Sequence, residues 1–130
     1  MFIDASALVS ILLPEEDGEA LMQRVQEAET RIVTPLVIFE TVLAIKRVVQ
    51  LSVSDAWHIL SLFLQRCDIV VVEIGADVHS QALLAYDRYG KGMGHPAQLN
   101  LGDCFSYAMA KSLRLPLLYK GGDFSQTDLA

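Results

Sequence analysis

The sequence predicts an α/β fold in which a short, mainly parallel sheet is covered by helices on both faces. Two observations predict it. Strand-like and helix-like segments alternate along the chain, and the strand-like segments are short and almost wholly apolar, as in buried parallel sheets. The length of 130 residues suits one domain, and 52% hydrophobic residues excludes a disordered chain. We therefore expect residues 1–130 to form a single three-layer α/β/α domain.

Four short segments have the composition of strands. They lie at residues 1–3, 31–34, 69–72 and 117–119. The third is an unbroken β-branched run, IVVV, which is typical of a strand buried on both faces. Helical segments separate all four, so consecutive strands are expected to run parallel.

The first two helices have recognisable ends. Residues 5–13 form a helix that stops before Pro14, because the residue preceding a proline avoids the helical conformation. The acidic residues 15–17 suit the first turn of a second helix, where negative charge complements the helix dipole. That helix is expected to run to about residue 29.

The next helices begin at capping residues. Thr34 and Pro35 are a typical helix start and predict a helix over residues 35–49. Ser52, three residues before Asp55, starts a fourth helix. This helix has an apolar stripe formed by Val53, Ala56, Trp57, Leu60, Phe63, Leu64 and Cys67. Two further helices, separated by a glycine-rich loop, are predicted at residues 76–89 and 102–113.

Composition also bears on location and partners. The longest apolar runs are far shorter than the ~18 residues a helix needs to cross a bilayer, and the first residues lack the pattern of a secretory signal. Cys67 and Cys104 have no metal-binding spacing and are expected to be reduced thiols in a cytoplasmic protein. The net charge of −6 argues against a protein that holds nucleic acid by charge alone.

Three aspartates lie near the ends of predicted elements. Asp4 follows the first strand, Asp123 follows the last one closely, and Asp103 lies at the start of the last helix. Each of them could be a helix cap with no further role. The carboxyl ends of parallel strands nevertheless meet at one edge of the sheet, which is where such folds place their sites.

Glu40 is a fourth acid, in an unusual position. Its helical neighbours are Leu36, Val37, Leu43 and Ala44, so it lies on an apolar face. An unpaired charge there would cost several kcal/mol, at roughly the scale of ion burial. Glu40 therefore needs a cation, which includes a salt bridge to Arg or Lys, or a proton, or an open cleft.

Four carboxylates gathered at one edge would repel one another, and this repulsion would raise at least one pKa. A hard divalent cation such as Mg²⁺ or Mn²⁺ would relieve the repulsion, because it prefers oxygen ligands and leaves positions for water and phosphate. The four carboxylates and the bound cation would together form a site for phosphodiester hydrolysis.

Specific segments carry a resemblance to a known family. They are FIDASAL at residues 2–8, the helix that contains Glu40, LGDCFSYA at residues 101–108 and LYKGGDF at residues 118–124. These segments resemble the signature segments of PIN-domain ribonucleases, and most closely those of the VapC toxins of bacterial toxin–antitoxin pairs. The resemblance covers nearly the whole chain, in order and at the family's spacing.

The resemblance implies a Mg²⁺- or Mn²⁺-dependent endoribonuclease that acts as the toxin of a VapBC-type pair. It implies a homodimer in the cytoplasm of a prokaryote, held inactive by a VapB-type antitoxin. Asp4 and Asp103 would bind the metal directly, and Glu40 and Asp123 directly or through water. Ser6 would support the metal ligands by a hydrogen bond. The chain stops at Ala130, soon after Asp123, whereas many PIN domains continue into another strand. We therefore expect four strands here, with a fifth short or absent.

Basic residues close to these segments are candidates for contact with RNA. Arg47 lies about two helical turns after Glu40. Lys91 and His95 lie in the glycine-rich loop, and Lys120 lies three residues before Asp123. The helix of Glu40 has a second apolar face, formed by Ile38, Val42, Ile45 and Val49. This face indicates either a surface for a partner protein or deeper burial in the core.

Other function classes fit the sequence less well. A signalling receiver would need an aspartate at the end of its central strand, but the third predicted strand is followed by Glu73. A haloacid-dehalogenase-like phosphatase would need two acids in a D-x-D motif, where the chain has Asp4-Ala5-Ser6. A catalytically inactive PIN-like or receiver-like binding module is the alternative.

Overall fold

The computed structural model describes residues 1–130 and contains one sheet of four parallel strands in the order β3-β2-β1-β4. The strands are two residues long: β1 (Phe2–Ile3), β2 (Ile32–Val33), β3 (Val70–Val71) and β4 (Leu117–Leu118). The predicted parallel four-stranded sheet is confirmed. Because β2 and β3 extend the sheet on one side of β1 and β4 lies on the other, the strand order reverses between β1 and β4.

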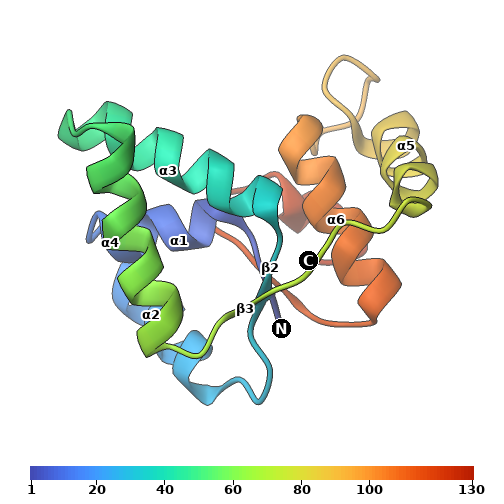
Figure 1. Ribbon diagram of the computed structural model, residues 1–130. Coiled ribbons are helices and arrows are strands. Elements are labelled where there is room, and N and C mark those ends of the chain that lie inside the picture. The colour runs from blue at the N-terminus through green and yellow to red at the C-terminus, as the bar shows by residue number, and fades with distance from the viewer.

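Helices cover the sheet from both sides (Figure 1). One layer holds α1 (Ala5–Leu12), α2 (Gly18–Glu27), α3 (Pro35–Val49) and α4 (Val53–Arg66). The other layer holds α5 (Val78–Tyr89) and α6 (Leu101–Leu113). Helix α3 also contacts α6, so the two layers meet across one end of the sheet. None of these helices combines the length and the apolar character that crossing a membrane requires.

The core is one cluster of 29 buried apolar residues. Phe2, Ile3 and Leu118 are completely buried, because β1 and β4 lie between the two helical layers. Burying a side chain of this size stabilises the fold by about 1.5–3 kcal/mol, so these short strands hold the layers together through their side chains.

Strand β3 differs from the prediction. Val70 is 58% exposed and Val71 is 46% exposed. Strand β3 lies at one edge of the sheet without a closely packed helix, whereas β4, at the other edge, packs against α6 and is buried. The prediction of a strand buried on both faces was wrong. A β-branched run has the same composition on a covered strand and on an open edge, so it does not distinguish the two positions.

The helix starts at Thr34 and Ser52 are confirmed. The Thr34 hydroxyl accepts a hydrogen bond from the Val37 amide at 3.4 Å, and the Ser52 hydroxyl accepts one from the Asp55 amide at 3.0 Å. Helix α2 instead begins three residues later than expected, at Gly18, where a side chain would collide with the Ser10 carbonyl. The acidic residues 15–17 therefore form the turn before α2.

Two helices bury faces that differ from those expected. On α4, Ala56, Leu60 and Leu64 are buried, whereas Val53 and Trp57 of the predicted stripe are exposed. On α3, Val42 and Ile45 of the predicted partner face are buried instead. The exposed large apolar residues of α3 are Phe39, Leu43, Val48 and Val49.

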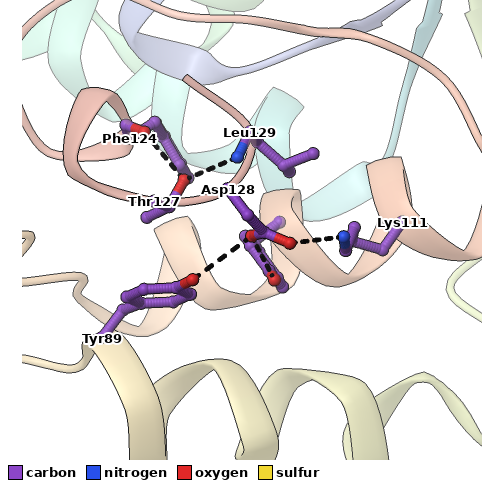
Figure 2. Close-up of polar contacts among 7 residues, drawn as sticks. Tyr89, Lys111, Phe124, Thr127, Asp128 and Leu129 are labelled. Atoms are coloured by element: carbon purple, nitrogen blue, oxygen red, sulfur yellow. Dashed lines mark hydrogen bonds and ion pairs between the residues drawn. The ribbon is translucent and has the colours of Figure 1, made fainter.

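The last residues of the chain are fastened to α5 and α6 (Figure 2). The Asp128 carboxylate accepts hydrogen bonds from the Tyr107 hydroxyl at 2.7 Å, the Lys111 ammonium at 2.6 Å and the Tyr89 hydroxyl at 3.4 Å. A short 3₁₀ helix, η1 (Phe124–Gln126), precedes this contact. The contact therefore fixes the segment that follows Asp123.

Candidate active site

One cleft of about 660 Å³ is lined by all four acids singled out in the sequence, namely Asp4, Glu40, Asp103 and Asp123. They come from the end of β1, from α3, from the first turn of α6 and from the turn after β4. The cleft lies where β1 and β4 end and the strand order reverses, which is the usual position of a site in an open parallel sheet.

Asp4 is buried and held by two serine hydroxyls. The Ser6 hydroxyl donates to Asp4 Oδ2 and the Ser106 hydroxyl donates to Asp4 Oδ1, each at 2.6 Å. The Ser6 amide also donates to Oδ2, at 3.0 Å, so Asp4 caps α1 as well. The Lys120 amide donates to the Ser6 hydroxyl at 3.0 Å and ties the end of β4 to the same network. Both carboxylate oxygens thus have a fixed orientation.

Glu40 is half-buried and lies against Gly102 of α6. A Cβ at Gly102 would overlap the Glu40 carboxylate, so only glycine allows this close approach. Glu40 Oε1 is buried and has no hydrogen-bond partner. Burial, followed by the charges of Asp4 and Asp103, raises the pKa of Glu40 to about 7.

Asp103 is the third residue of α6 and forms a reciprocal capping box with Asn100. The Asp103 amide donates to Asn100 Oδ1 at 2.9 Å, and the Asn100 amide donates to Asp103 Oδ2 at 3.0 Å. Burial raises the pKa of Asp103 to about 6; the hydrogen bond from Asn100 opposes this shift, and the charges of Asp4 and Asp123 add to it. The residue that caps α6 is Asn100, so Asp103 is not the N-cap that the sequence left as its alternative role.

Asp123 is exposed at the rim of the cleft. It precedes η1, but its side chain makes no capping hydrogen bond. The alternative role of Asp123 as a helix cap is therefore not supported by a side-chain contact. Asp123 lines the cleft with the other three acids, and its charge contributes to the raised pKa of Asp103.

No cation neutralises these four acids. The two ion pairs of the protein join Lys111 to Asp128 and Lys120 to Glu15. The salt bridge to Arg or Lys considered for Glu40 is absent. A charged, partly buried set of oxygen donors with an unpartnered carboxylate oxygen fits a hard divalent cation. No three acidic, His or Cys side chains already converge on one point, so such an ion would take few protein ligands and keep waters.

The four basic candidates separate into two groups. Arg47 and Lys120 line the cleft together with the acids. Lys91 is exposed in the glycine-rich loop, outside the cleft lining. His95 packs its ring edge-on against Tyr89, with ring centroids 4.9 Å apart, and its Nδ1 accepts a hydrogen bond from a loop amide. It also lies outside the cleft lining.

Three polar residues of the site were not assigned a role from the sequence. Glu15 and Asn100 line the cleft, and Ser106 hydrogen-bonds to Asp4 from outside the lining. Ser106 lies within the LGDCFSYA segment, one helical turn after Asp103, and this spacing could have indicated that it lies on the same side of the helix. Asn100 precedes Asp103 by three residues, the spacing of a capping box. Glu15 gave no comparable signal, because it is one of three consecutive acids in a turn.

Comparison with known proteins agrees with this arrangement. The family model of the PIN domain matches residues 1–129. The chain belongs to the PIN-domain family. It is 42% identical to a VapC ribonuclease of Rhizobium meliloti, with 98% of each chain covered, and 43% identical to the ribonuclease VapC of Mycolicibacterium smegmatis, with 100% and 98% covered. It is also 41% identical to the ribonuclease VapC30 of Mycobacterium tuberculosis, with 100% and 96% covered.

A solved structure of a VapC toxin has the same fold. The crystal structure of VapC20 of Mycobacterium tuberculosis, described as a sarcin-ricin loop cleaving toxin, superposes with a TM-score of 0.72 over 95% of this chain and 92% of that one. The two sequences are 17% identical. This likeness supports the PIN fold, and the membership in the VapC group rests on the closer relatives.

Proposed function

We propose that this PIN-domain protein is a Mg²⁺- or Mn²⁺-dependent endoribonuclease and the toxin of a VapBC-type pair in the cytoplasm. One observation carries the proposal. Four carboxylates from separate parts of the chain line a single cleft, and none of them has a cationic partner. The names of the relatives, which are VapC ribonucleases at 41–43% identity, support the same activity.

The residues present define how a metal would be held. Asp4 and Asp103 would bind it directly, and Glu40 and Asp123 directly or through water. A divalent cation bound there supplies Lewis-acid polarisation of a phosphoryl oxygen and lowers the pKa of a water. The raised pKa values of Glu40 and Asp103 support this assignment, because positive charge at the cleft would favour their ionised forms.

The protein's own groups orient the reacting parts. The hydroxyls of Ser6 and Ser106 hold the Asp4 carboxylate in one orientation and leave it an acceptor. Arg47 and Lys120 supply positive charge at the cleft for the RNA backbone. The half-buried position of Glu40 reduces its contact with bulk water, so its charge acts in a medium less polar than water.

Cleavage of a panel of structured RNAs by the purified protein tests the activity. Wild type should cut RNA in Mg²⁺ or Mn²⁺ and should stop when EDTA is added. Asp4→Asn should lower the rate at least about a hundredfold, since it alters a direct ligand. The control is Asp77→Asn, which changes an exposed aspartate that makes no capping hydrogen bond. Cleavage that survives both EDTA and Asp4→Asn would leave the inactive binding module as the better account.

The partner proteins are a VapB-type antitoxin and a second copy of the chain. Exposed apolar side chains lie at or near the cleft: Leu43 lines it, and Phe39 and Leu101 are the chain neighbours of the cleft residues Glu40 and Asn100. Induced expression should arrest bacterial growth, and co-expression of the adjacent open reading frame should relieve the arrest. Light scattering of the purified chain should give the mass of a dimer. Unrelieved arrest would count against the antitoxin, and a monomer mass against the homodimer.

A further inference from the structure

A fifth carboxylate of the cleft, unlike the other four, forms an ion pair. Glu15, in the turn between α1 and α2, forms an ion pair with Lys120, and both residues line the cleft with the four acids. We propose that Lys120 and the adjacent Gly121–Gly122 turn form a subsite for a backbone phosphodiester of the RNA. Glu15 occupies this subsite in the free protein, and RNA displaces it. The inference rests on the proposed ribonuclease function, for which it defines one point of substrate contact.

The position of Lys120 ties the subsite to the acids. Its amide donates to the Ser6 hydroxyl at 3.0 Å, and that hydroxyl donates to Asp4. The backbone of Lys120 is therefore held next to the Asp4 network. A phosphate bound by its side chain would lie in the same cleft as the acids.

The turn after Lys120 is open to a ligand. Gly121 has a φ of 98°, and nothing lies within 4 Å of the place where its Cβ would be. The corresponding place at Gly122 is met only by the Ser125 hydroxyl, at 4.0 Å. The backbone that follows Lys120 thus borders free space in which a phosphate can approach it, and side chains do not obstruct it.

Charge explains why Glu15 is the group that leaves. The other four carboxylates of the cleft have no cation, whereas Glu15 places its negative charge on Lys120 as a phosphate oxygen would. The side chains of Lys120 and Glu15 are 29% and 38% exposed. An ion pair this exposed contributes little to stability, so a phosphate can replace the carboxylate at small cost.

Binding of a fluorescent single-stranded RNA, measured by anisotropy in EDTA so that no cleavage occurs, tests the subsite. Glu15→Gln should bind the RNA about three- to fivefold more tightly than wild type, the range expected for release of one exposed ion pair. Its salt dependence should be steeper by about 0.7 in log–log slope, the value for one additional phosphate contact with a single strand. Lys120→Gln should bind more weakly than wild type.

Two comparisons separate masking of Lys120 from a general loss of negative charge. Glu16→Gln removes the same charge one residue away, outside the cleft lining. Glu16 acts on Lys120 through its charge but forms no ion pair with it, so this variant should raise affinity clearly less than Glu15→Gln does. In the background of Lys120→Gln, the effect of Glu15→Gln should disappear. Equal gains from Glu15→Gln and Glu16→Gln, a gain that persists without Lys120, or weaker binding by Glu15→Gln would each overturn the proposal.

A last arm distinguishes RNA from free phosphate. Inorganic phosphate, compared with chloride at equal ionic strength, should compete only weakly with the RNA on Glu15→Gln. Saturation of that variant by inorganic phosphate, with no gain in its RNA affinity, would reject the RNA subsite. These results do not depend on catalysis. Failure of wild type to cut RNA would contradict the proposed function, whereas cleavage by wild type without the Glu15 effect would contradict only this inference.

Discussion

Gly102 keeps the Glu40 carboxylate in the cleft by leaving room for it. A methyl group at this position would overlap the carboxylate, which is the mobile end of a long side chain. Gly102→Ala should therefore displace Glu40 and lower RNA cleavage at least about tenfold, while the stability of the fold changes by less than about 1 kcal/mol, since alanine also favours the helix. Cleavage rates and urea unfolding measure the two effects. Full activity in this variant would show that the position of Glu40 is unimportant.

The raised pKa of Glu40 has a consequence for stability. Its folded value of about 7 lies above the ordinary value of 4.5, so between these pH values the folded protein binds more protons than the unfolded chain. The stability of the metal-free protein should therefore fall as pH rises through this window. Glu40→Gln lacks this ionisation and its pH dependence. The difference in free energy of unfolding, variant minus wild type, should therefore increase by about 1–2 kcal/mol between pH 4.5 and pH 8.

Urea unfolding in EDTA at several pH values measures this difference. Asp103 contributes in the same direction between its ordinary value of 3.8 and about 6, in wild type and variant alike, so it cancels in the comparison. If the difference in unfolding free energy between the two proteins does not change with pH, then folding does not destabilise the ionised form of Glu40.

Ser106 orients Asp4 from the helix behind it. The hydroxyl is buried, and its hydrogen bond to Asp4 Oδ1 joins residues 102 positions apart. Ser106→Ala should weaken Mn²⁺ binding and slow cleavage by about tenfold, the lower end of the effect of losing a group that orients a metal ligand. Ser112→Ala, on the exposed part of the same helix, is the control. Equal Mn²⁺ affinity in the two variants would mean that Asp4 needs no such support.

The acids of the site were easier to predict from the sequence than the residues that hydrogen-bond to them. Glu40 was conspicuous because a charge on an apolar helix face requires an explanation. Ser106 was not conspicuous, because a serine in a helix has no large energetic penalty that would call for a functional explanation. Its role depends on a contact with Asp4 that only the tertiary structure creates. Asp103 was placed at the correct helix start, but its capping role belongs to Asn100.

The C-terminal segment is held against α6 by hydrogen bonds to Asp128. Partial burial acts to raise the pKa of Asp128, but hydrogen bonds from Lys111 and Tyr107 outweigh it and lower the pKa below its usual value. The stabilisation is therefore present above the ordinary pKa of 3.8 and is lost as pH falls through the folded pKa. Because Asp128 is exposed, its ion pair is worth about 1 kcal/mol or less.

Asp128→Asn should loosen the segment that carries Asp123. Hydrogen exchange of residues 121–130 should become faster in the variant at neutral pH, and the unfolding free energy should fall by at most about 1 kcal/mol. The difference in unfolding free energy should vanish as pH falls below the folded pKa of Asp128. Asp77→Asn serves as the control. Unchanged exchange in this segment would mean that η1 and the buried Phe124 hold it without the Asp128 contact.

Local signals determined how well each element could be predicted. Thr34, Pro35 and Ser52 act within one helical turn, so the starts of α3 and α4 followed from neighbouring residues alone. The exposure of β3 depends on which strand pairs with which, and the valines at positions 70 and 71 contain no information about that. The start of α2 depends on the packing of Gly18 against α1, which is again a tertiary contact.

The whole molecule combines an acidic surface with a site for an anionic substrate. The net charge is −6, and the basic residues that line the cleft are Arg47 and Lys120. The proposed function therefore requires RNA affinity to come mainly from these few cations and from the proposed metal, because a net charge of −6 gives no general attraction for a polyanion. The parallel topology makes this possible by bringing four acids, distant in sequence, to the ends of β1 and β4.

The four acids of the cleft are proposed to form one divalent-metal site. Calorimetric titration of the metal-free protein with Mn²⁺ measures this binding on wild type, on Asp4→Asn and Asp103→Asn, and on the control Asp77→Asn. Wild type and the control should bind one or two ions with equal affinity, and each cleft variant should bind at least about tenfold more weakly. Binding of Mn²⁺ that is the same in all four proteins, or absent from wild type, would contradict the account.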